Sequence, residues 1–361
     1  MATDKLESSI KIDQTLAVSR DATQRRRVNI QKVQNALLIW LDNNIDSNSK
    51  DYQNTIIQLR RAINNISTFT DSDQCIEFIQ TINDNKVCMI MPGFLGQHTV
   101  PCVHNMSQVD SIFIFCGNKK RHEQWIRDWP KIKGVFTEIA SICEALKQAV
   151  HQCEQNAMPL TFMPSNKKLD QLDPSFMYTR ILKDILINMD FEEKHIKEYI
   201  DYCHDVFADN KEELIHIELL ERQYSSKTPI WWYTYQCFLY PMLNRALRLI
   251  DGDIIIRMGF FIKDLHQHID KLHAKQFGDQ YSTASFTVYR GQGLSKIDFE
   301  QMSKTKGGLI SFNNFLSTSK KREVSLDFAQ HAATNPDLVG ILFIMQIDPA
   351  QSTTPFASIR E

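Results

Sequence analysis

The sequence predicts an α/β domain followed by an α+β domain. Two observations lead to this prediction. Short apolar runs alternate with amphipathic segments in the first part of the chain, and near its end a helical spacing of apolar residues gives way to strict alternation. With 361 residues the chain also exceeds the ~100–200 residues typical of one domain, so more than one compact unit is expected.

Five apolar runs within residues 33–156 read as strands bounded by turn formers. They lie at 36–42, 66–71, 86–93, 111–118 and 134–139. Amphipathic segments follow them, some beginning with Ser or Asp as a helix cap, and predict helices at 52–64, 72–83, 99–106, 123–130 and 142–155. Such β–α units predict a five-stranded parallel, flavodoxin-like sheet with helices on both faces.

The strand ends of this unit argue against the commonest ligands of such a sheet. The third strand ends in Met91-Pro92-Gly93 rather than in an acidic residue, and no GxGxxG or GxxxxGK[ST] loop follows any strand. Asp42 and Asp71 are interpreted as turn and cap residues. We therefore expect an interaction or regulatory module whose partner is unknown. A nucleotide hydrolase of a TIR-like kind is the alternative, and it requires a glutamate in a cleft at the carboxyl ends of the strands.

Composition excludes several classes of partner. The 41 basic and 43 acidic residues nearly balance, so a nucleic-acid partner is not expected. The eight cysteines show no CxxC spacing and are interpreted as reduced and buried. The start of the chain has no apolar core of a signal peptide, and no apolar stretch approaches the ~18 residues needed to span a bilayer. We expect a cytoplasmic protein that does not bind membranes.

The remaining segments complete the predicted organisation. Residues 1–32 are expected to be a flexible N-terminus, and 157–175, with three prolines, a linker. Within 176–361, helices are predicted at 176–189, 192–207, 211–224, 231–250 and 259–274, then strands at 284–291, 307–319 and 340–349 with helices at 299–306 and 322–332. Trp231, Trp232 and Tyr235 are interpreted as packing residues. His266, His268 and His273 lack HExxH spacing, so no metal is expected.

Arg290 and a serine-rich segment after it are the candidate site residues. At the end of the predicted strand 284–291, Arg290 would present a fork of donors suited to two oxygens of a phosphate or carboxylate. Gly291 and Gly293 would let a ligand approach the main chain. A surface salt bridge is the competing interpretation. The serines at 317–319, at the end of the next predicted strand, lack a GxSxG or SxxK motif, which favours orientation of a neighbouring group over nucleophilic attack.

Four sequence motifs in a fixed order favour the ligand site over the surface salt bridge. "TVYRGQ", "ISFNNFLSTS", "VSLDFA" and "PFASI" follow one another, after a helical lead-in that begins "TPIWWYTYQ". Over roughly residues 228–361 the chain resembles the R-S-E class of mono-ADP-ribosyltransferases, of the arginine-specific type. The resemblance implies an ADP-ribosyltransferase domain in which NAD lies across a split β-sandwich. It assigns Arg290 to the ribose-phosphate part of NAD and the main chain of Gly291 to the nicotinamide amide.

The same resemblance assigns roles in the second block. Ser317 would position the catalytic glutamate, with Thr318 and Ser319 completing the NAD-binding serine motif, and Asn314 would be a further NAD contact. Phe312 or Phe315 would pack against the nicotinamide ring, although core packing is the competing interpretation of both rings.

The resemblance also implies an activity and a missing part. The expected reaction transfers ADP-ribose from NAD, or from NADP, to an arginine of an acceptor protein and releases nicotinamide. The E-x-E pair of the family follows the "PFASI" block, Glu361 is not assigned to it, and the domain is expected to be truncated at its C-terminus, with little transferase activity of its own. The alternative is a catalytically inactive interaction or scaffold protein of the same fold.

Overall fold

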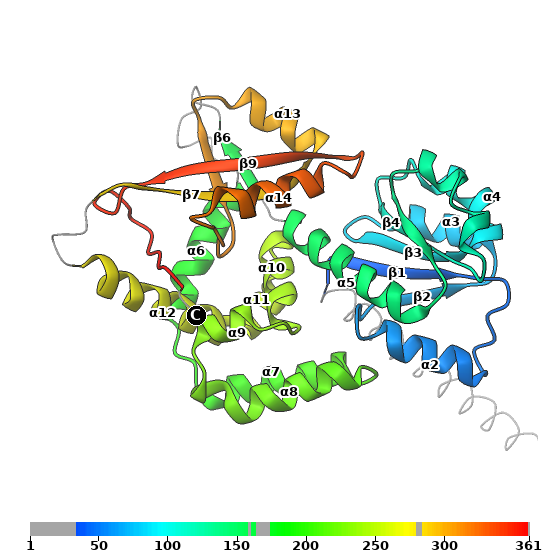
Figure 1. Ribbon diagram of the computed structural model, residues 1–361. Coiled ribbons are helices and arrows are strands. Elements are labelled where there is room, and N and C mark those ends of the chain that lie inside the picture. Colours follow the sequence, from blue (N-terminus) through cyan, green and yellow to red (C-terminus); the bar gives the residue numbers. More distant parts are fainter. Residues whose placement is uncertain (1–33, 158–159, 164–173, 279–283, 360–361) are drawn as a thin grey trace, which may run out of the picture.

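The computed structural model describes residues 34–157, 160–163, 174–278 and 284–359. The N-terminal segment 1–32, most of the predicted linker and Glu361 lie outside the described residues. Figure 1 shows two parts beside each other, a sheet with its helices on the right and a helical layer under a long two-stranded ribbon on the left. No helix among the described ranges is both long enough and apolar enough to cross a membrane.

The first part is built on a parallel sheet. Its strands are β1 (Ala36–Leu41), β2 (Ile66–Phe69), β3 (Lys86–Pro92), β4 (Val109–Phe115) and β5 (Ile132–Phe136). They run parallel in the order β2-β1-β3-β4-β5, which is the order of flavodoxin-like sheets. The strands are almost wholly apolar because each face of the sheet packs into its own buried cluster. The predicted α/β unit is confirmed.

Helices cover both faces of this sheet. They are α2 (Lys50–Leu59), α3 (Ser72–Gln80), α4 (Gly93–Val103) and α5 (Ile139–Asn156), with short 3₁₀ turns η1 (Lys119–Arg121) and η2 (Trp125–Asp128). The helix predicted at 123–130 is wrong, since only the 3₁₀ turn η2 forms there. Trp129 precedes Pro130, whose ring disfavours helical backbone at the residue before it, and its backbone is not helical (φ −121°, ψ 88°), so the turn does not continue into a helix.

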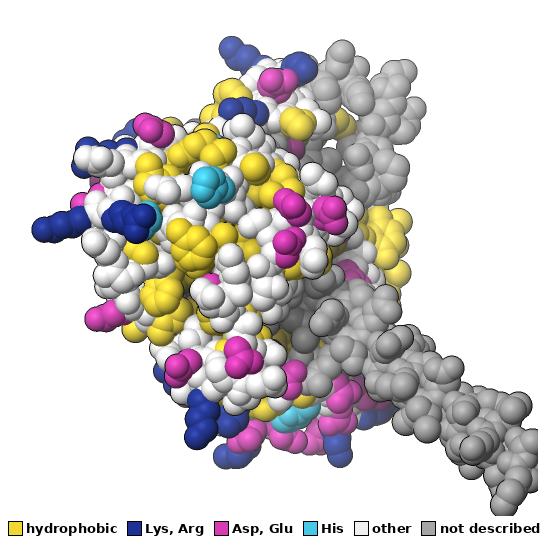
Figure 2. Space-filling view, turned by 90° about the vertical axis from the view of Figure 1, so that its right-hand side faces the viewer, with side chains coloured by type: hydrophobic (Ala, Val, Ile, Leu, Met, Phe, Trp, Pro, Cys, Tyr) yellow, Lys and Arg dark blue, Asp and Glu magenta, His cyan; other side chains and the backbone are white. Residues whose placement is uncertain are grey.

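The prediction that all cysteines are buried is wrong for three of them. Figure 2 shows hydrophobic side chains among polar ones on the outer face of the α/β part. All eight cysteines are free thiols, and five are buried as expected. Cys102 on α4 is exposed, however, and Cys116 and Cys237 are half-buried.

The second part begins with a helical layer. Its helices are α6 (Pro174–Asn188), α7 (Glu193–Val206), α8 (Lys211–Gln223), η4 (Tyr224–Ser226), α9 (Pro229–Thr234), α10 (Leu239–Leu249), α11 (Gly252–Arg257) and α12 (Gly259–Phe277). The single helix predicted at 231–250 is two helices, because Tyr235 is extended (φ −68°, ψ 132°) and stacks on Trp231 with ring centroids 4.6 Å apart. Trp232 is 1% exposed and belongs to the core of this layer, as predicted.

Two small antiparallel sheets lie against this layer. Their elements are β6 (Leu160–Met163), β7 (Phe286–Ser295), α13 (Lys296–Lys304), β8 (Leu309–Phe312), α14 (Arg322–Ala332) and β9 (Leu338–Ile347). β7 pairs with β9 and β6 with β8, so part of the predicted linker is a strand. The strand predicted at 307–319 ends at Phe312. Asn313 follows it and uses its side chain for hydrogen bonds to Ser311 and Thr161 instead of continuing the ladder.

The end of α5 joins the two parts. Asn156 accepts a hydrogen bond from the main-chain nitrogen of Gly293 on β7 at 2.7 Å. Two residues earlier, Glu154 accepts from the main-chain nitrogen of Asn35 at 2.8 Å and from its side-chain amide. Asn35 in turn accepts from Arg245 and Arg248 on α10. A buried polar chain therefore connects the α/β part to the helical layer beneath β7.

Glu154 is expected to make stability depend on pH. Burial raises its pKa to about 7, against the opposing effects of Asn35, Arg245 and Arg248. The folded state thus binds a proton that the unfolded chain has already released, so the free energy of unfolding should fall as pH rises from about 5 to about 7, by at most about 3 kcal/mol, and then level off. Urea unfolding of the whole chain at several pH values measures this slope.

The Glu154→Gln variant isolates the contribution of this carboxyl group from that of the titrating histidines. Its free energy of unfolding should lack the Glu154 part of the decline, so the difference between variant and parent changes through this pH window. Glu144→Gln is the matched control, because Glu144 lies on the same helix with an exposed side chain. Parallel pH profiles for the parent and both variants would contradict the prediction.

Candidate functional site

The sequence predicts Arg290 at the end of a strand. In the structure it lies in the middle of β7, because this strand continues to Ser295. Its side chain shares one face of the β7–β9 ribbon with Gln292. It is 8% exposed, and its Nε donates to Oε1 of Gln292 at 3.1 Å while Nη1 donates to the main-chain oxygen of Ser317 at 2.8 Å. The surface salt bridge is wrong as an account of this residue, because the guanidinium is buried and hydrogen-bonded to uncharged groups.

The electrostatics around Arg290 leave its charge unneutralised. In the part of the chain that the structure describes, no carboxylate forms an ion pair or hydrogen bond with it. Burial lowers the pKa of Arg290, and the nearby Tyr240 and Tyr233 oppose this effect. An arginine keeps its proton under these conditions. A buried cation without a counter-ion is costly unless a ligand supplies the opposite charge.

The serine segment reaches Arg290 by a route that the sequence did not predict. Ser317, Thr318 and Ser319 lie seven or fewer residues beyond the end of β8, in irregular structure. Ser319 alone pairs with β7, exchanging two main-chain hydrogen bonds with Tyr289 (2.7 and 2.8 Å). Ser317 offers its carbonyl oxygen to Arg290, and its hydroxyl, like that of Thr318, belongs to an exposed residue. Arg290 and Ser317 are thus brought together.

Gly291 packs against α14 through its Cα and directs its main-chain N–H and C=O to one edge of β7. A Cβ there would lie 1.7 Å from the main-chain oxygen of Ser325, so the close approach is made by α14 and not, on that side, by a ligand as the sequence suggested. Because Tyr289 directs its N–H and C=O to Ser319, away from β9, the alternation of an antiparallel ladder directs those of Gly291 and Gly293 to the same edge. Gly293 uses its N–H for Asn156. The main-chain groups of Gly291 therefore lie on the edge of β7 away from β9.

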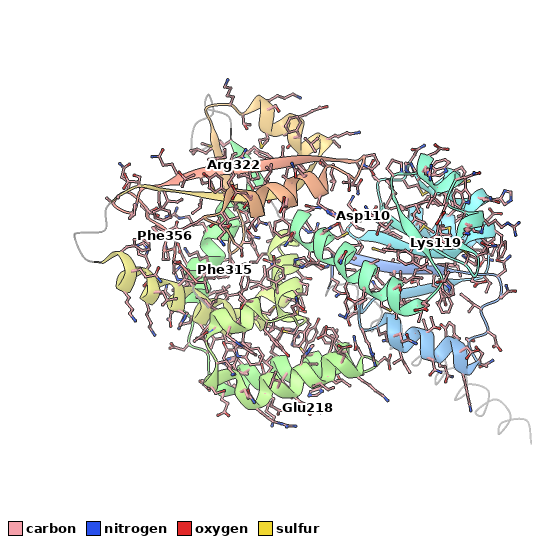
Figure 3. The ribbon with its side chains drawn as sticks, viewed as in Figure 1. Asp110, Lys119, Glu218, Phe315, Arg322 and Phe356 are labelled. Carbon is pink, nitrogen blue, oxygen red and sulfur yellow. The ribbon has the colours of Figure 1, made fainter. Side chains whose placement is uncertain are left out.

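The other predicted contact residues, Asn314, Phe315 and Phe312, lie in different surroundings. Asn314 has a buried Oδ1 with no partner among the described residues. Phe315 packs into the helical core, where its ring is 5.8 Å from that of Tyr233, whose hydroxyl donates to the Phe315 carbonyl at 3.0 Å. Figure 3 shows Phe315 between the β7–β9 ribbon and the helices. Phe312 contacts Phe343 edge-on at 5.5 Å. Phe315 therefore makes core contacts, whereas Phe312 makes a ring contact with β9 outside the buried clusters, and a contact of either ring with nicotinamide stays a prediction.

Sequence reasoning missed Gln292. It is 1% exposed and touches the guanidinium of Arg290 directly. The signal that could have identified it is its spacing of two residues from Arg290, which places both side chains on one face of a strand. The strand predicted at 284–291 stops before Gln292, so the alternation of side chains is not extended to this residue.

The carboxyl edge of the parallel sheet offers no comparable site among the described residues. Asp71 caps α3 by accepting from the main-chain nitrogen of Gln74, and Asp42 accepts from that of Asn44, in agreement with the prediction. At the start of α4, the ring of His122 packs so closely on Gly93 that a Cβ there would lie 2.5 Å from it. The close packing of protein side chains explains this glycine without a ligand.

Glu138 follows β5 and is exposed, so it does not provide the cleft glutamate that a hydrolase at this edge would need. The described residues also include no group of three or more His, Cys, Asp or Glu side chains arranged to hold a metal ion. Of the three histidines considered as ligands, His273 instead contacts the main-chain oxygen of Phe356 at 2.9 Å. Comparisons with protein-family models, with curated proteins and with solved structures found no match to this chain.

Proposed function

We propose that the unit carrying β7 is the NAD-binding part of a mono-ADP-ribosyltransferase that modifies arginine, with NAD or NADP as donor. The observation that supports this most is the buried, uncompensated guanidinium of Arg290 beside the carbonyl of Ser317 and the main-chain groups of Gly291 on the edge of β7 away from β9. A cation at this place suits the diphosphate of a dinucleotide, and adjacent main-chain N–H and C=O groups suit the carboxamide of nicotinamide.

The chemistry of the reaction defines what the site must supply. Cleavage of the nicotinamide–ribose bond builds positive charge on the ribose, as in glycoside hydrolysis, so a carboxylate near the ribose stabilises the transition state. Arg290 would hold the phosphates and Ser317 would lie at the reacting end. None of the described residues is assigned to the acidic pair of the R-S-E pattern, so the carboxylate near the ribose is itself part of this proposal. The α/β part, joined through α5, would be an interaction or regulatory unit for an acceptor or partner protein.

Arg290→Lys tests the proposal directly. Lysine keeps the charge but loses the planar fork that holds two phosphate oxygens, so NAD affinity should fall at least about tenfold. Isothermal calorimetry of the chain with NAD, and separately with NADP, measures it. Arg322→Lys, an exposed arginine at the start of α14 that Figure 3 labels, is the matched control and should bind like the parent.

Two outcomes separate the proposal from its alternative. No measurable NAD or NADP binding by the parent would reject a dinucleotide site at Arg290. NAD binding without transfer from labelled NAD to agmatine, in this chain and in any longer product of the same gene, would support the inactive interaction protein.

A further inference from the structure

Gln292 is a buried amide that satisfies only one side of its hydrogen-bonding capacity. Its Oε1 accepts from Nε of Arg290 at 3.1 Å, whereas its Nε2 is buried and has no partner among the described residues. The side chain faces the same side of the ribbon as Arg290 and pairs in register with Ile341 of β9, which offers no polar side chain. An unmet buried donor of this kind costs about 1–3 kcal/mol, so its retention needs an explanation.

The orientation of this amide follows from chemistry. Arginine has only donors, so the group that faces its Nε must be the oxygen of Gln292. The two N–H bonds of Nε2 therefore point elsewhere and await an acceptor. With Nε held by Gln292, the terminal nitrogens of Arg290 form the free end of the fork, and one of them now donates to the carbonyl of Ser317. A phosphate oxygen is an acceptor of the same kind and can replace that carbonyl.

We propose that Gln292 is a positioning residue for diphosphate recognition: its carbonyl fixes the guanidinium of Arg290, and its amide nitrogen is a second donor to the same phosphate group. This inference rests on the proposed function of Arg290. It gives the unmet amide donor of Gln292 a role in ligand binding. It also assigns the diphosphate as the part of the dinucleotide that binds at this face of β7.

The Gln292→Glu variant separates binding from stability. The carboxylate keeps an acceptor for Nε, adds a charge that pairs with Arg290 and removes the unmet donor, so the melting temperature should stay the same or rise. The same change places a negative oxygen where a phosphate would lie and neutralises the guanidinium, so the affinities for NAD and for ADP-ribose should both fall at least about tenfold. Gln346→Glu is the control, with the same charge change at an exposed position of β9.

The outcomes distinguish this inference from the proposed function. If the parent binds neither NAD nor ADP-ribose, the proposed function and this inference fail together. If Arg290→Lys loses NAD affinity while Gln292→Glu binds like the parent, only the inference fails. A parallel loss of melting temperature and affinity, or an equal loss of affinity in Gln346→Glu, would also overturn it. Should Gln292→Glu not fold, Gln292→Met serves instead: it has similar length, lacks both polar groups and should weaken NAD binding without a carboxylate.

Discussion

Replacing Gly291 by Ala is expected to destabilise the chain by about 3 kcal/mol or more. The added Cβ would lie 1.7 Å from the main-chain oxygen of Ser325, 2.8 Å from its carbonyl carbon and 2.9 Å from the main-chain nitrogen of Ala329. These are backbone atoms of α14, which cannot rotate away as a side chain can, so the helix must lift off the β7–β9 ribbon. Urea unfolding of the whole chain measures the change in the free energy of unfolding.

Gly117→Ala is the matched control, because a Cβ at Gly117 meets nothing within 4 Å. This variant should change stability by less than about 0.5 kcal/mol, as surface substitutions usually do. If Gly291→Ala lowered the free energy of unfolding by less than about 1 kcal/mol, α14 would not pack against β7 as closely as described. Because the substitution also moves the main chain beside Arg290, NAD affinity should fall in any Gly291→Ala protein that remains folded.

The parallel sheet could be predicted from the sequence because its signal is local. Each strand is a short apolar run between turn formers, and burial on both faces keeps that run continuous. The β7 boundary could not be predicted in the same way. Gly291 and Gly293 lower strand propensity and read as a turn, and only the packing of α14 against them makes glycine the residue that a strand needs there.

The candidate site likewise combines features that the sequence predicts with features that depend on tertiary contacts. Arg290 and Ser317 were singled out by a resemblance of ordered motifs, and the structure brings them to 2.8 Å between Nη1 and the Ser317 carbonyl. Their geometry was outside the reach of the sequence, because Ser317 lies in an irregular segment whose path depends on the Tyr289–Ser319 pairing, a tertiary contact. Gln292 is 1% exposed and pairs in register with Ile341 of β9, and its spacing from Arg290 becomes informative only once β7 is known to continue past Gly291.

Removing the carboxylate of Asp337 is expected to cost about 2–3 kcal/mol. Lys131 lies immediately before β5 with a side chain that is 0% exposed, and its Nζ contacts Asp337 at 2.6 Å and the main-chain oxygen of Met106 at 2.9 Å. Asp337→Ala leaves that ammonium buried without its counter-charge, which typically costs about 3–5 kcal/mol. The expected value is lower here because Asp337 itself is 36% exposed, so water can partly replace it.

This pair also joins the α/β part to the turn before β9, beside the hydrogen bond from Asn335 to Asp110 at 2.8 Å. Loss of Asp337 should therefore loosen the contact between the two parts, and unfolding followed by tryptophan fluorescence should broaden or separate into two transitions. Lys131→Met supplies the contrast, because it removes the buried charge together with the need for a partner and should change stability by less than about 1 kcal/mol. If Lys131→Met were instead as destabilising as Asp337→Ala, the ion pair would itself be a net source of stability, and the cost of an unpaired buried charge would not explain the Asp337 result.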